Sequence, residues 1–310
     1  MNPPTPVSTE TDSAAIDPSR ASAEVSDGHL YVVATPIGNL GDLSPRALRV
    51  LSAVNAICAE DTRVTGGLLS HFGVRARLIA LHEHNETEIA GKLVTRLLAG
   101  ESLALVSDAG TPLVSDPGFA LVRASRAAGV PVMTVPGPCA VVAALSVSGL
   151  PSDRFVFEGF LPSRRGARRS RLEALADCRD TLIVYESSHR IAECLTDCAE
   201  VLGAARRICL ARELSKRFEQ SITDTASRLC EWLAEDGNRS RGEFVLVIEG
   251  AADSAQPDEV DRILRALLGE LEPSRAARVA AELTGQRKNA LYKRALEMAA
   301  GAAESPDRVE

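Results

Sequence analysis

The sequence lacks several features that would place it in a specialised class. None of its seven cysteines forms a CxxC pair, and the start of the chain has neither the basic residues nor the apolar core of a signal peptide. No apolar run approaches the roughly 18 residues that a membrane-spanning helix needs. These absences predict a cytoplasmic protein with reduced cysteines in its core. The formal net charge of −7 also argues against a generally basic protein that coats nucleic acid, although it leaves room for local basic patches.

The chain of 310 residues is long enough for two domains with cores of their own. Residues 1–28 hold five acidic side chains against one arginine, a composition typical of a disordered acidic tail. We expect an N-terminal α/β domain over 29–148, a C-terminal α/β domain over 149–250, and a linker with a helical module over 251–310.

Strand-like and helix-like patterns alternate from His29 onward, which predicts an α/β fold with a mostly parallel, covered sheet. The expected strands of the first domain are 29–34, 55–59, 77–81, 102–107 and 131–135, with clear helices at Ser44–Cys58 and Phe119–Ala128. The second domain has expected strands at 154–158, 181–185, 206–211 and 243–249, and helices at 165–177, 189–202 and 223–234. The module has three helical patterns, at 258–271, 274–284 and 286–300.

Two loops in the first domain resemble each other. Ala104–Gly118 and His29–Leu43 each begin as an apolar strand and break into small residues, prolines and glycines. Such residues leave the main chain uncovered, and ligands bind at the carboxyl ends of strands in open α/β sheets. We expect the two loops to form one binding site.

Four polar clusters follow apolar runs, at 60–63, 82–86, 186–190 and 212–216. A single such cluster is more often a salt bridge or helix cap, but four at strand ends favour a functional site. His82 and His84 point the same way on a strand but lack an evident third ligand, and Cys194 and Cys198 lack further ligands at zinc spacing. We therefore expect no metal.

Two regions are rich in basic side chains. Five arginines open the helix at 165–177, and clustered guanidinium groups suit phosphate, which favours single-stranded RNA over duplex DNA as the partner. The helical module has a basic segment between Ser274 and Arg294 that fits either nucleic-acid docking or a solvated helical hairpin. The candidate RNA-binding residues are Arg164, Arg165, Arg168, Arg169, Arg171, Arg287, Lys288, Lys293 and Arg294.

Nine motifs in order resemble the branch of the tetrapyrrole methylase superfamily that methylates ribosomal RNA. They are ATPIGNLGDLSPRAL, CAEDTR, HEHNE, SDAGTPLVSDPG, VPGPCA, FEGFLP, YESSHR, ARELSK and GEFVLVIEG. The likeness runs from about His29 to Gly250, and SRAARVAAELTG resembles the extra helical module of that branch. It implies a two-domain fold that binds S-adenosyl-L-methionine between its domains, a homodimer, and methyl transfer to a cytidine ribose 2′-hydroxyl of 16S ribosomal RNA in the small ribosomal subunit. It implies neither a membrane nor a DNA partner.

The resemblance also assigns site residues. The implied cofactor-binding residues are Pro36, Gly38, Ser107, Asp108, Ala109, Gly110, Thr111, Pro112, Ser115, Pro136, Gly137, Pro138, Tyr185 and Leu210. Removal of the hydroxyl proton needs a base. The candidate catalytic residues are Glu60, Asp61, Arg63, Glu186, His189, Glu213 and Lys216, and we favour the cluster at 60–63 because it ends a strand next to the first loop.

The chain departs from the family pattern at three positions. Val64 replaces a common histidine, Cys139 a serine and Ser188 a proline, so a histidine at position 64 is excluded as the base. Two other functions stay open: a methylase of a small tetrapyrrole-like molecule, and a ribosome-binding protein without catalysis. The basic segments disfavour the first, and the intact 108–112 loop disfavours the second.

Overall fold

The computed structural model describes residues 25–251, 259–284 and 288–303. The chain divides into two compact units, Met1–Gly250 and Ala251–Glu310. Most of the expected acidic tail lies outside the described residues. Its last residues, 25–28, are tied to the fold, because Ser26 N–H donates to the Tyr31 hydroxyl (2.9 Å) and Gly28 N–H to Gly100 O (3.0 Å). The folded part of the chain therefore begins a few residues before the expected end of the tail at residue 28.

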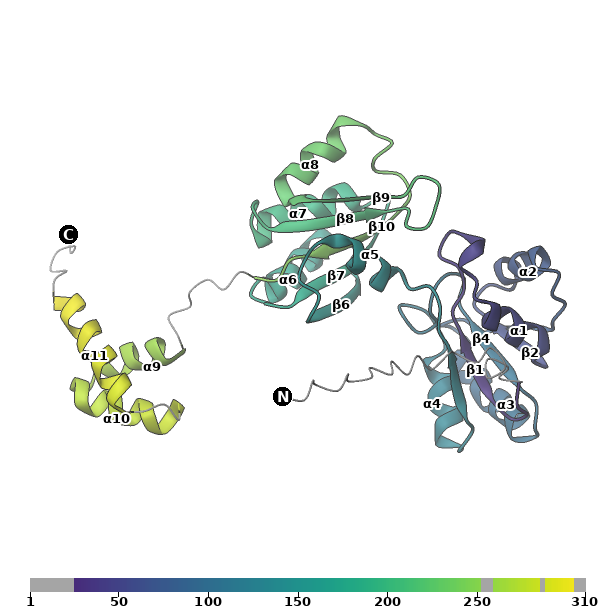
Figure 1. The fold of residues 1–310 in the computed structure, drawn as a ribbon, viewed down its shortest axis with the longest axis horizontal. Coiled ribbons are helices and arrows are strands. Elements are labelled where there is room, and N and C mark those ends of the chain that lie inside the picture. Colours follow the sequence, from purple (N-terminus) through teal and green to yellow (C-terminus); the bar gives the residue numbers. More distant parts are fainter. Residues whose placement is uncertain (1–24, 252–258, 285–287, 304–310) are drawn as a thin grey trace, which may run out of the picture. The chain divides into compact units, whose positions relative to one another are not determined.

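The first sheet of the larger unit is parallel and has the order β3-β2-β4-β1-β5 (Figure 1). Strands β2 and β4 are buried along their whole length, which explains why they appear in the sequence as unbroken apolar runs. The strands are β1 Leu30–Val33, β2 Ala56–Ala59, β3 Leu78–Ala80, β4 Leu103–Val106 and β5 Val132–Val135. The helices are the short 3₁₀ turn η2 Leu40–Asp42 and α1 Pro45–Ala53, α2 Thr62–His71, α3 Glu86–Leu98 and α4 Phe119–Ala127.

Helix α1 ends at Ala53, so the expected helix to Cys58 was too long. Its start follows the sequence signals: the Ser44 hydroxyl accepts from Ala47 N–H at 3.0 Å, and proline occupies the first position. Its end is set by tertiary structure, because Asn55 exchanges hydrogen bonds with Ser102 at the start of β4. The apolar residues that continue the helical spacing instead form β2.

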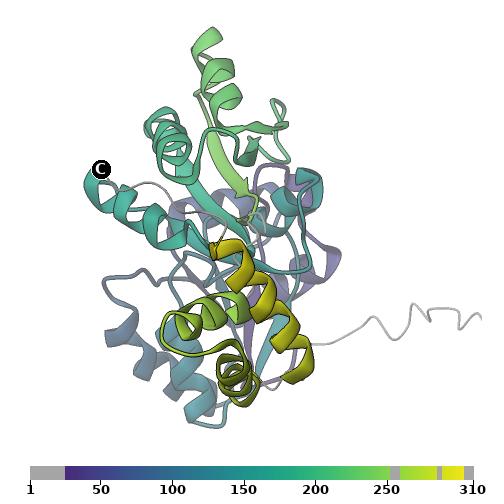
Figure 2. The same ribbon diagram turned by 90° about the vertical axis from the view of Figure 1, so that its left-hand side faces the viewer.

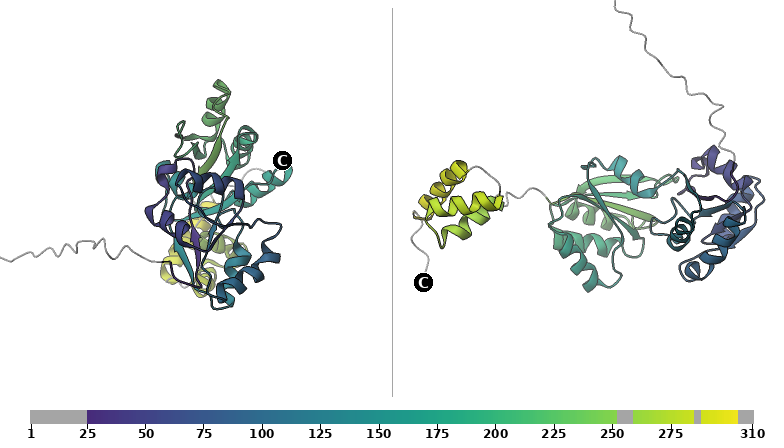
Figure 3. Two further views of the ribbon diagram at one scale, coloured as in Figure 1. Left: turned by 90° about the vertical axis from the view of Figure 1, so that its right-hand side faces the viewer. Right: turned by 90° about the horizontal axis from the view of Figure 1, so that it is seen from below.

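The second sheet is mixed, with the order β6-β7-β10-β8-β9. Strands β6 and β7 are parallel, whereas β10 runs antiparallel to both β7 and β8, and β9 antiparallel to β8. The strands are β6 Phe155–Phe160, β7 Thr181–Ser187, β8 Arg207–Arg212, β9 Gln220–Thr225 and β10 Glu243–Ile248. The helices are α5 Ala140–Ser148, α6 Arg165–Leu175, α7 Ile191–Leu202 and α8 Ala226–Glu235. Figure 3 shows both sheets with their helices from two further sides.

The two faces of the second sheet have different covers. Helices α6, α7 and α8 pack on one face around residues such as Leu210 and Leu246. Helix α5 packs on the other face through Val141, Ala144 and Leu145, which contact β8 and β10. Helix α5 lies inside the range expected for the first domain but covers the second sheet. The chain therefore passes from one sheet to the other just before α5.

The smaller unit is a bundle of three helices, α9 Glu259–Leu268, α10 Pro273–Thr284 and α11 Lys288–Ala303 (Figure 2). Small residues allow the helices to approach closely around a core of Leu264, Ala277, Ala280, Leu291 and Ala295. None of the described helices of either unit has the length and apolar character to span a membrane.

Candidate active site

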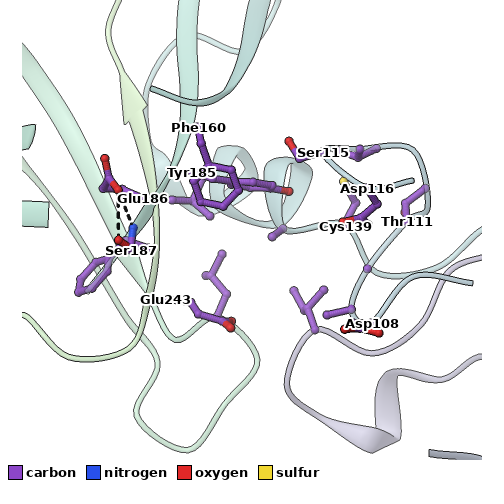
Figure 4. A pocket seen from close by; sticks show the side chains of 18 of the residues that line it. Asp108, Thr111, Ser115, Asp116, Cys139, Phe160, Tyr185, Glu186, Ser187 and Glu243 are labelled. Atoms are coloured by element: carbon purple, nitrogen blue, oxygen red, sulfur yellow. Dashed lines mark hydrogen bonds between the residues drawn. The ribbon is translucent and has the colours of Figure 1, made fainter. Parts of the chain in front are cut away.

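A cavity of about 430 Å³ lies inside the larger unit, where loops of the first sheet face the second sheet (Figure 4). Its volume is that of a small-molecule site. The first sheet contributes Ile37, Glu60 and most of the loop from Asp108 to Asp116, and Cys139 and Ala140 lie at the start of α5. The second sheet contributes residues of β6, β7 and β10 and the loop after β8, namely Phe160, Tyr185, Glu186, Ser187, Leu214, Glu243, Phe244 and Val245.

Three strand-end loops are tied together under the cavity. Thr35 after β1 and Gly110 after β4 form two backbone hydrogen bonds, of 2.9 and 3.0 Å. The Thr35 hydroxyl donates to Ser107 O (3.2 Å), and the Thr111 hydroxyl donates to Pro138 O after β5 (2.9 Å). Because β4, β1 and β5 are neighbours in a parallel sheet, their carboxyl ends meet at one edge. The structure thus brings together the two loops that resemble each other.

The loop after β4 has an unusual backbone. Gly110, Leu113 and Ser115 have φ angles of 85°, 73° and 66°, a region that L-residues with side chains rarely adopt. Within the described residues, the backbone N–H groups of Ala109, Thr111 and Leu113 donate no hydrogen bond. Strained backbone clusters at functional sites, and unpaired N–H groups suit an anionic group of a ligand.

The implied cofactor residues divide into two groups. Asp108, Ala109, Gly110, Thr111, Ser115 and Tyr185 line the cavity. Ser107 belongs to the second group. It is buried beneath the loop, and its hydroxyl lies within 3.5 Å of Ala109 O and Gly110 O. The residues that do not line the cavity are Pro36, Gly38, Ser107, Pro112, Pro136, Gly137, Pro138 and Leu210.

The implied role of Leu210 in cofactor binding is corrected by the structure. Successive side chains of a strand point to opposite faces, and Cys209 and Ala211 take the face covered by α5. Leu210 is fully buried in the core on the other face, among the side chains of α7 and α8. Its side chain is therefore not part of the cavity wall.

Gly38 and Gly137 lie where neighbouring residues approach the backbone closely. A Cβ at Gly38 would collide with the side chain of Lys216, and one at Gly137 would lie 3.0 Å from Ala34 Cβ. Lys216 bridges Glu213 Oε1 and Glu243 Oε2 at 2.9 Å each. Of these three, Glu243 alone lines the cavity. Glu213 and Lys216 therefore hold the loop after β8 in place beside Gly38.

The other catalytic candidates differ in position. Glu60 lines the cavity, and burial raises the pKa of its carboxyl, with a smaller opposing effect of the Asp108 N–H. Asp61 does not line it: its carboxylate caps α2 and binds the exposed Arg63 guanidinium at 2.6 Å. Those hydrogen bonds lower the pKa of Asp61 to about 2, which makes it a poor base. In the cluster at 60–63, Glu60 thus lines the cavity, whereas Asp61 caps α2.

The 186–190 cluster has one residue in the cavity wall. Glu186 is buried and accepts from Arg190 Nη2 (3.1 Å) and Ser187 N–H (2.8 Å). Arg190 also donates to Leu161 O at 2.6 Å, so it joins the end of β7 to the segment after β6. His189 is exposed and does not line the cavity.

Several cavity residues escaped the sequence analysis. Phe160 and Tyr185 have ring centroids 5.6 Å apart and form an aromatic wall (Figure 4). Burial raises the pKa of Asp116 to about 6, and the neighbouring Glu60 and Asp108 add to the rise, against a hydrogen bond from Ser107. Asp116 stood in the second turn of the same loop, so a carboxylate among small residues and proline was the available signal. Phe160 and Glu243 stand in the FEGFLP and GEFVLVIEG motifs, so the resemblance marked their segments but assigned neither residue a role.

The arginine cluster mostly forms ion pairs within the protein. Arg168 is fully buried and binds Asp197 of α7 at 2.7 Å, and Arg165 binds the same carboxylate at 2.9 Å. Arg169 pairs with Glu200, and Arg171 pairs with Glu158 at 2.6 Å. The expected contact of Arg168 with RNA is therefore wrong, since its charge is used inside the fold. Arg164 is exposed at the start of α6.

In the smaller unit, Lys288 and Lys293 are exposed on α11. Arg294 binds Asp261 of α9 and so joins two helices, and Arg287 lies outside the described residues. Within the described ranges, no three His, Cys, Asp or Glu side chains gather as a metal site would require.

Comparison with known proteins identifies the protein family to which the chain belongs. Residues 29–230 match the family model of the Tetrapyrrole (Corrin/Porphyrin) Methylases, and residues 254–299 match that of the RsmI C-terminal HTH domain. Among solved structures, the methyltransferase CobJ has a TM-score of 0.54 at 19% identity, covering 73% of this chain and 95% of that chain. Cobalt precorrin-4 methyltransferase has a TM-score of 0.51 at 16% identity over 71% and 94%. These likenesses show the fold.

Three relatives define the family more closely, and each has the name Ribosomal RNA small subunit methyltransferase I. The protein of Xylella fastidiosa strain Temecula1 is 59% identical over 86% of this chain and 98% of its own length. Those of Pseudomonas aeruginosa and Escherichia coli O157:H7 are 53% and 52% identical, over 98% and 97% of their lengths. The chain belongs to the tetrapyrrole methylases and, within them, to the family of ribosomal RNA small subunit methyltransferase I.

Proposed function

We propose that this protein transfers a methyl group from S-adenosylmethionine to the 2′-hydroxyl of a cytidine in 16S ribosomal RNA of the small ribosomal subunit. The observation that supports it most is the likeness to Ribosomal RNA small subunit methyltransferase I, which extends over 97–98% of the relatives' lengths and includes the helical module. A cytoplasmic homodimer completes the proposal, on the strength of the family resemblance.

The cavity fits this methyl donor. Its walls contain the carboxylates of Glu60 and Asp108, which favour a ligand with a sulfonium and an ammonium group. The unpaired N–H groups of the 109–113 segment suit a carboxylate, and Tyr185 and Phe160 suit an adenine ring. When bound, the donor supplies a methyl group on a positively charged sulfur, which is a good leaving group. The protein's part is to orient the two reactants and to remove a proton.

Mapping the product tests the proposal. Small subunits from a strain that lacks this protein are incubated with the purified protein and labelled donor, and the modified nucleotide is located by mass spectrometry. We expect one cytidine that carries its new methyl on the ribose, recognised by resistance of the next bond to alkali. Methyl on a base, or on a tetrapyrrole precursor offered in parallel, would overturn the proposal. A binding protein without activity would show no transfer at all.

Glu60 and Asp61 offer a matched pair of variants. Glu60→Gln removes a negative charge from the cavity wall and should weaken donor binding by about tenfold, the effect of losing one charge-assisted contact of about 1.5 kcal/mol. Asp61→Asn keeps a side chain that caps α2 and should leave donor binding near normal. Calorimetry with S-adenosylhomocysteine measures both. Equal effects of the two changes would contradict this assignment of the 60–63 cluster.

The helical module should contribute to RNA binding through its exposed lysines. Reversing both charges, with Lys288→Glu and Lys293→Glu, should raise the KM for small subunits about tenfold and flatten its salt dependence. Turnover at saturating substrate should stay near normal, as should donor binding. Lys92→Glu, on the exposed face of α3, is the control and should change neither. An unchanged KM in the double variant would favour the solvated helical hairpin.

A further inference from the structure

The five carboxylates of the cavity wall differ in what they already bind. Glu186 pairs with Arg190, and Glu243 Oε2 accepts from Lys216 Nζ at 2.9 Å. Glu186 thus has a cation of its own, whereas Glu243 shares Lys216 with Glu213. Their cation partners also hold segments of the second sheet, since Arg190 donates to Leu161 O and Lys216 bridges the loop after β8 to β10. Glu186 and Glu243 are therefore poorly placed to accept a further proton during catalysis.

Glu60 and Asp108 hold two loops of the first sheet together. Asp108 Oδ1 accepts from Asp61 N–H at 2.9 Å, and Glu60 Oε2 lies 3.4 Å from Asp108 N. Each carboxylate thus accepts a backbone N–H of the neighbouring loop. This reciprocal contact joins the ends of β2 and β4 at the wall of the cavity.

Asp116 differs from the other four carboxylates. It is half-buried, and its hydrogen bond comes from the Ser107 hydroxyl, whereas no cation and no backbone N–H of the described residues binds its carboxylate. Burying a carboxylate without such partners opposes folding. The turn that presents it contains Leu113 and Ser115 in the left-handed region, and its far end is held by Gly118 N–H, which donates to Glu86 at 2.6 Å. The fold maintains a strained turn and a carboxylate without a cation partner at the same point of the cavity.

We propose that Asp116 is the general base that accepts the proton of the acceptor hydroxyl, an inference that rests on the proposed function. As the ribose 2′-oxygen forms its bond to the methyl carbon, the carbon–sulfur bond of the donor breaks and its electron pair stays on sulfur. The hydroxyl proton passes to a carboxylate oxygen of Asp116. The aspartic acid then loses that proton to water before the next turnover.

The surroundings of Asp116 give it suitable basicity. Burial and the negative charges of Glu60 and Asp108 raise its pKa to about 6, while the Ser107 hydroxyl acts in the opposite direction. The other titratable groups that face it are Cys139 at the start of α5 and Tyr185 of β7. A carboxyl with this pKa is mostly ionised at neutral pH and is a stronger base than an ordinary aspartate. Activity should therefore rise with pH through about 6 and then level off.

Asp116→Asn tests the assignment at saturating donor and subunits. We expect kcat to fall by about 10²–10⁴-fold and the rise of kcat with pH near 6 to disappear. The affinity for S-adenosylhomocysteine should be nearly unchanged, and the melting temperature should not fall, because the substitution removes a half-buried negative charge that has no cation partner. Asp116→Glu keeps a carboxyl group and should retain a pH-dependent rise at reduced rate. Glu88→Gln, an exposed carboxylate paired with Lys92, is the control.

Three outcomes would overturn the assignment. They are wild-type kcat in Asp116→Asn, a reduced kcat with the pH-dependent rise intact, and a loss confined to donor binding. Failure of the proposed function is distinguishable, because it appears in the wild-type protein as methyl transferred to a different atom or molecule. A wild-type product methylated on the ribose, together with full activity of Asp116→Asn, would refute the base alone.

Discussion

Replacing Arg168 by leucine should lower the free energy of unfolding by about 3–5 kcal/mol, as expected when one partner of a buried ion pair is removed. Arg168 is fully buried, and so is Asp197, whose carboxylate it binds at 2.7 Å. The substitution leaves Asp197 buried with only part of its compensation, from Arg165 and Arg169. Urea unfolding of the full chain measures the loss. The control is Arg171→Leu, which breaks a partly exposed pair with Glu158 and should cost about 1 kcal/mol or less.

The pH dependence gives a second test of the same pair. Burial alone would raise the pKa of Asp197, but hydrogen bonds from Arg165 and Arg168 lower it below its ordinary value of 3.8. A lowered pKa stabilises the fold above the ordinary value, and this stability is lost as the pH falls through the folded value. The difference between wild type and Arg168→Leu should therefore shrink in acid. Adding Asp197→Leu should recover much of the loss, because an apolar pair can replace a buried ion pair. A loss for Arg168→Leu no larger than that for Arg171→Leu would contradict this account.

The partners of the arginine cluster could not be predicted from the sequence. Five arginines in the first turns of a helix predict an anionic partner, because the helix dipole disfavours them there. An anionic partner exists, but it is α7 of the same chain, about 25–35 positions further on. Its acidic residues belong to a separate amphipathic pattern. Only the packing of α6 on α7 reveals that Asp197 and Glu200 face the arginines.

The strand-end loops were more predictable. Each is marked by an apolar run followed by small residues, and a parallel sheet brings the carboxyl ends of neighbouring strands to one edge. The second half of the cavity was less predictable, because two faces alternate along each strand. Tyr185 and Leu210 both lie on central strands, but Tyr185 faces the cavity and Leu210 the helices. The register of β7 and β8 against β10 decides this difference.

Gly110→Ala should weaken donor binding by about ten- to a hundredfold, which corresponds to about 1–3 kcal/mol of backbone strain. Gly110 has a φ of 85°, and both its N–H and its C=O bind Thr35. A Cβ there would lie 3.3 Å from Ile37 Cγ2, a cavity residue. The loop would relieve this strain by moving, and the N–H groups of Ala109 and Thr111 would move with it. Calorimetry with S-adenosylhomocysteine and urea unfolding together measure the two consequences.

Gly73→Ala separates strain in general from strain at the cavity. Gly73 follows α2 with a φ of 68°, and a Cβ there would meet no atom within 4 Å. The two glycines thus share a left-handed conformation but not a location. Gly73→Ala should destabilise the fold by about 1 kcal/mol and leave donor binding intact. If both variants lost stability but bound the donor as tightly as the wild type, the conformation of the loop after β4 would be a requirement of folding alone. A binding defect confined to Gly110→Ala would tie that conformation to the methyl donor.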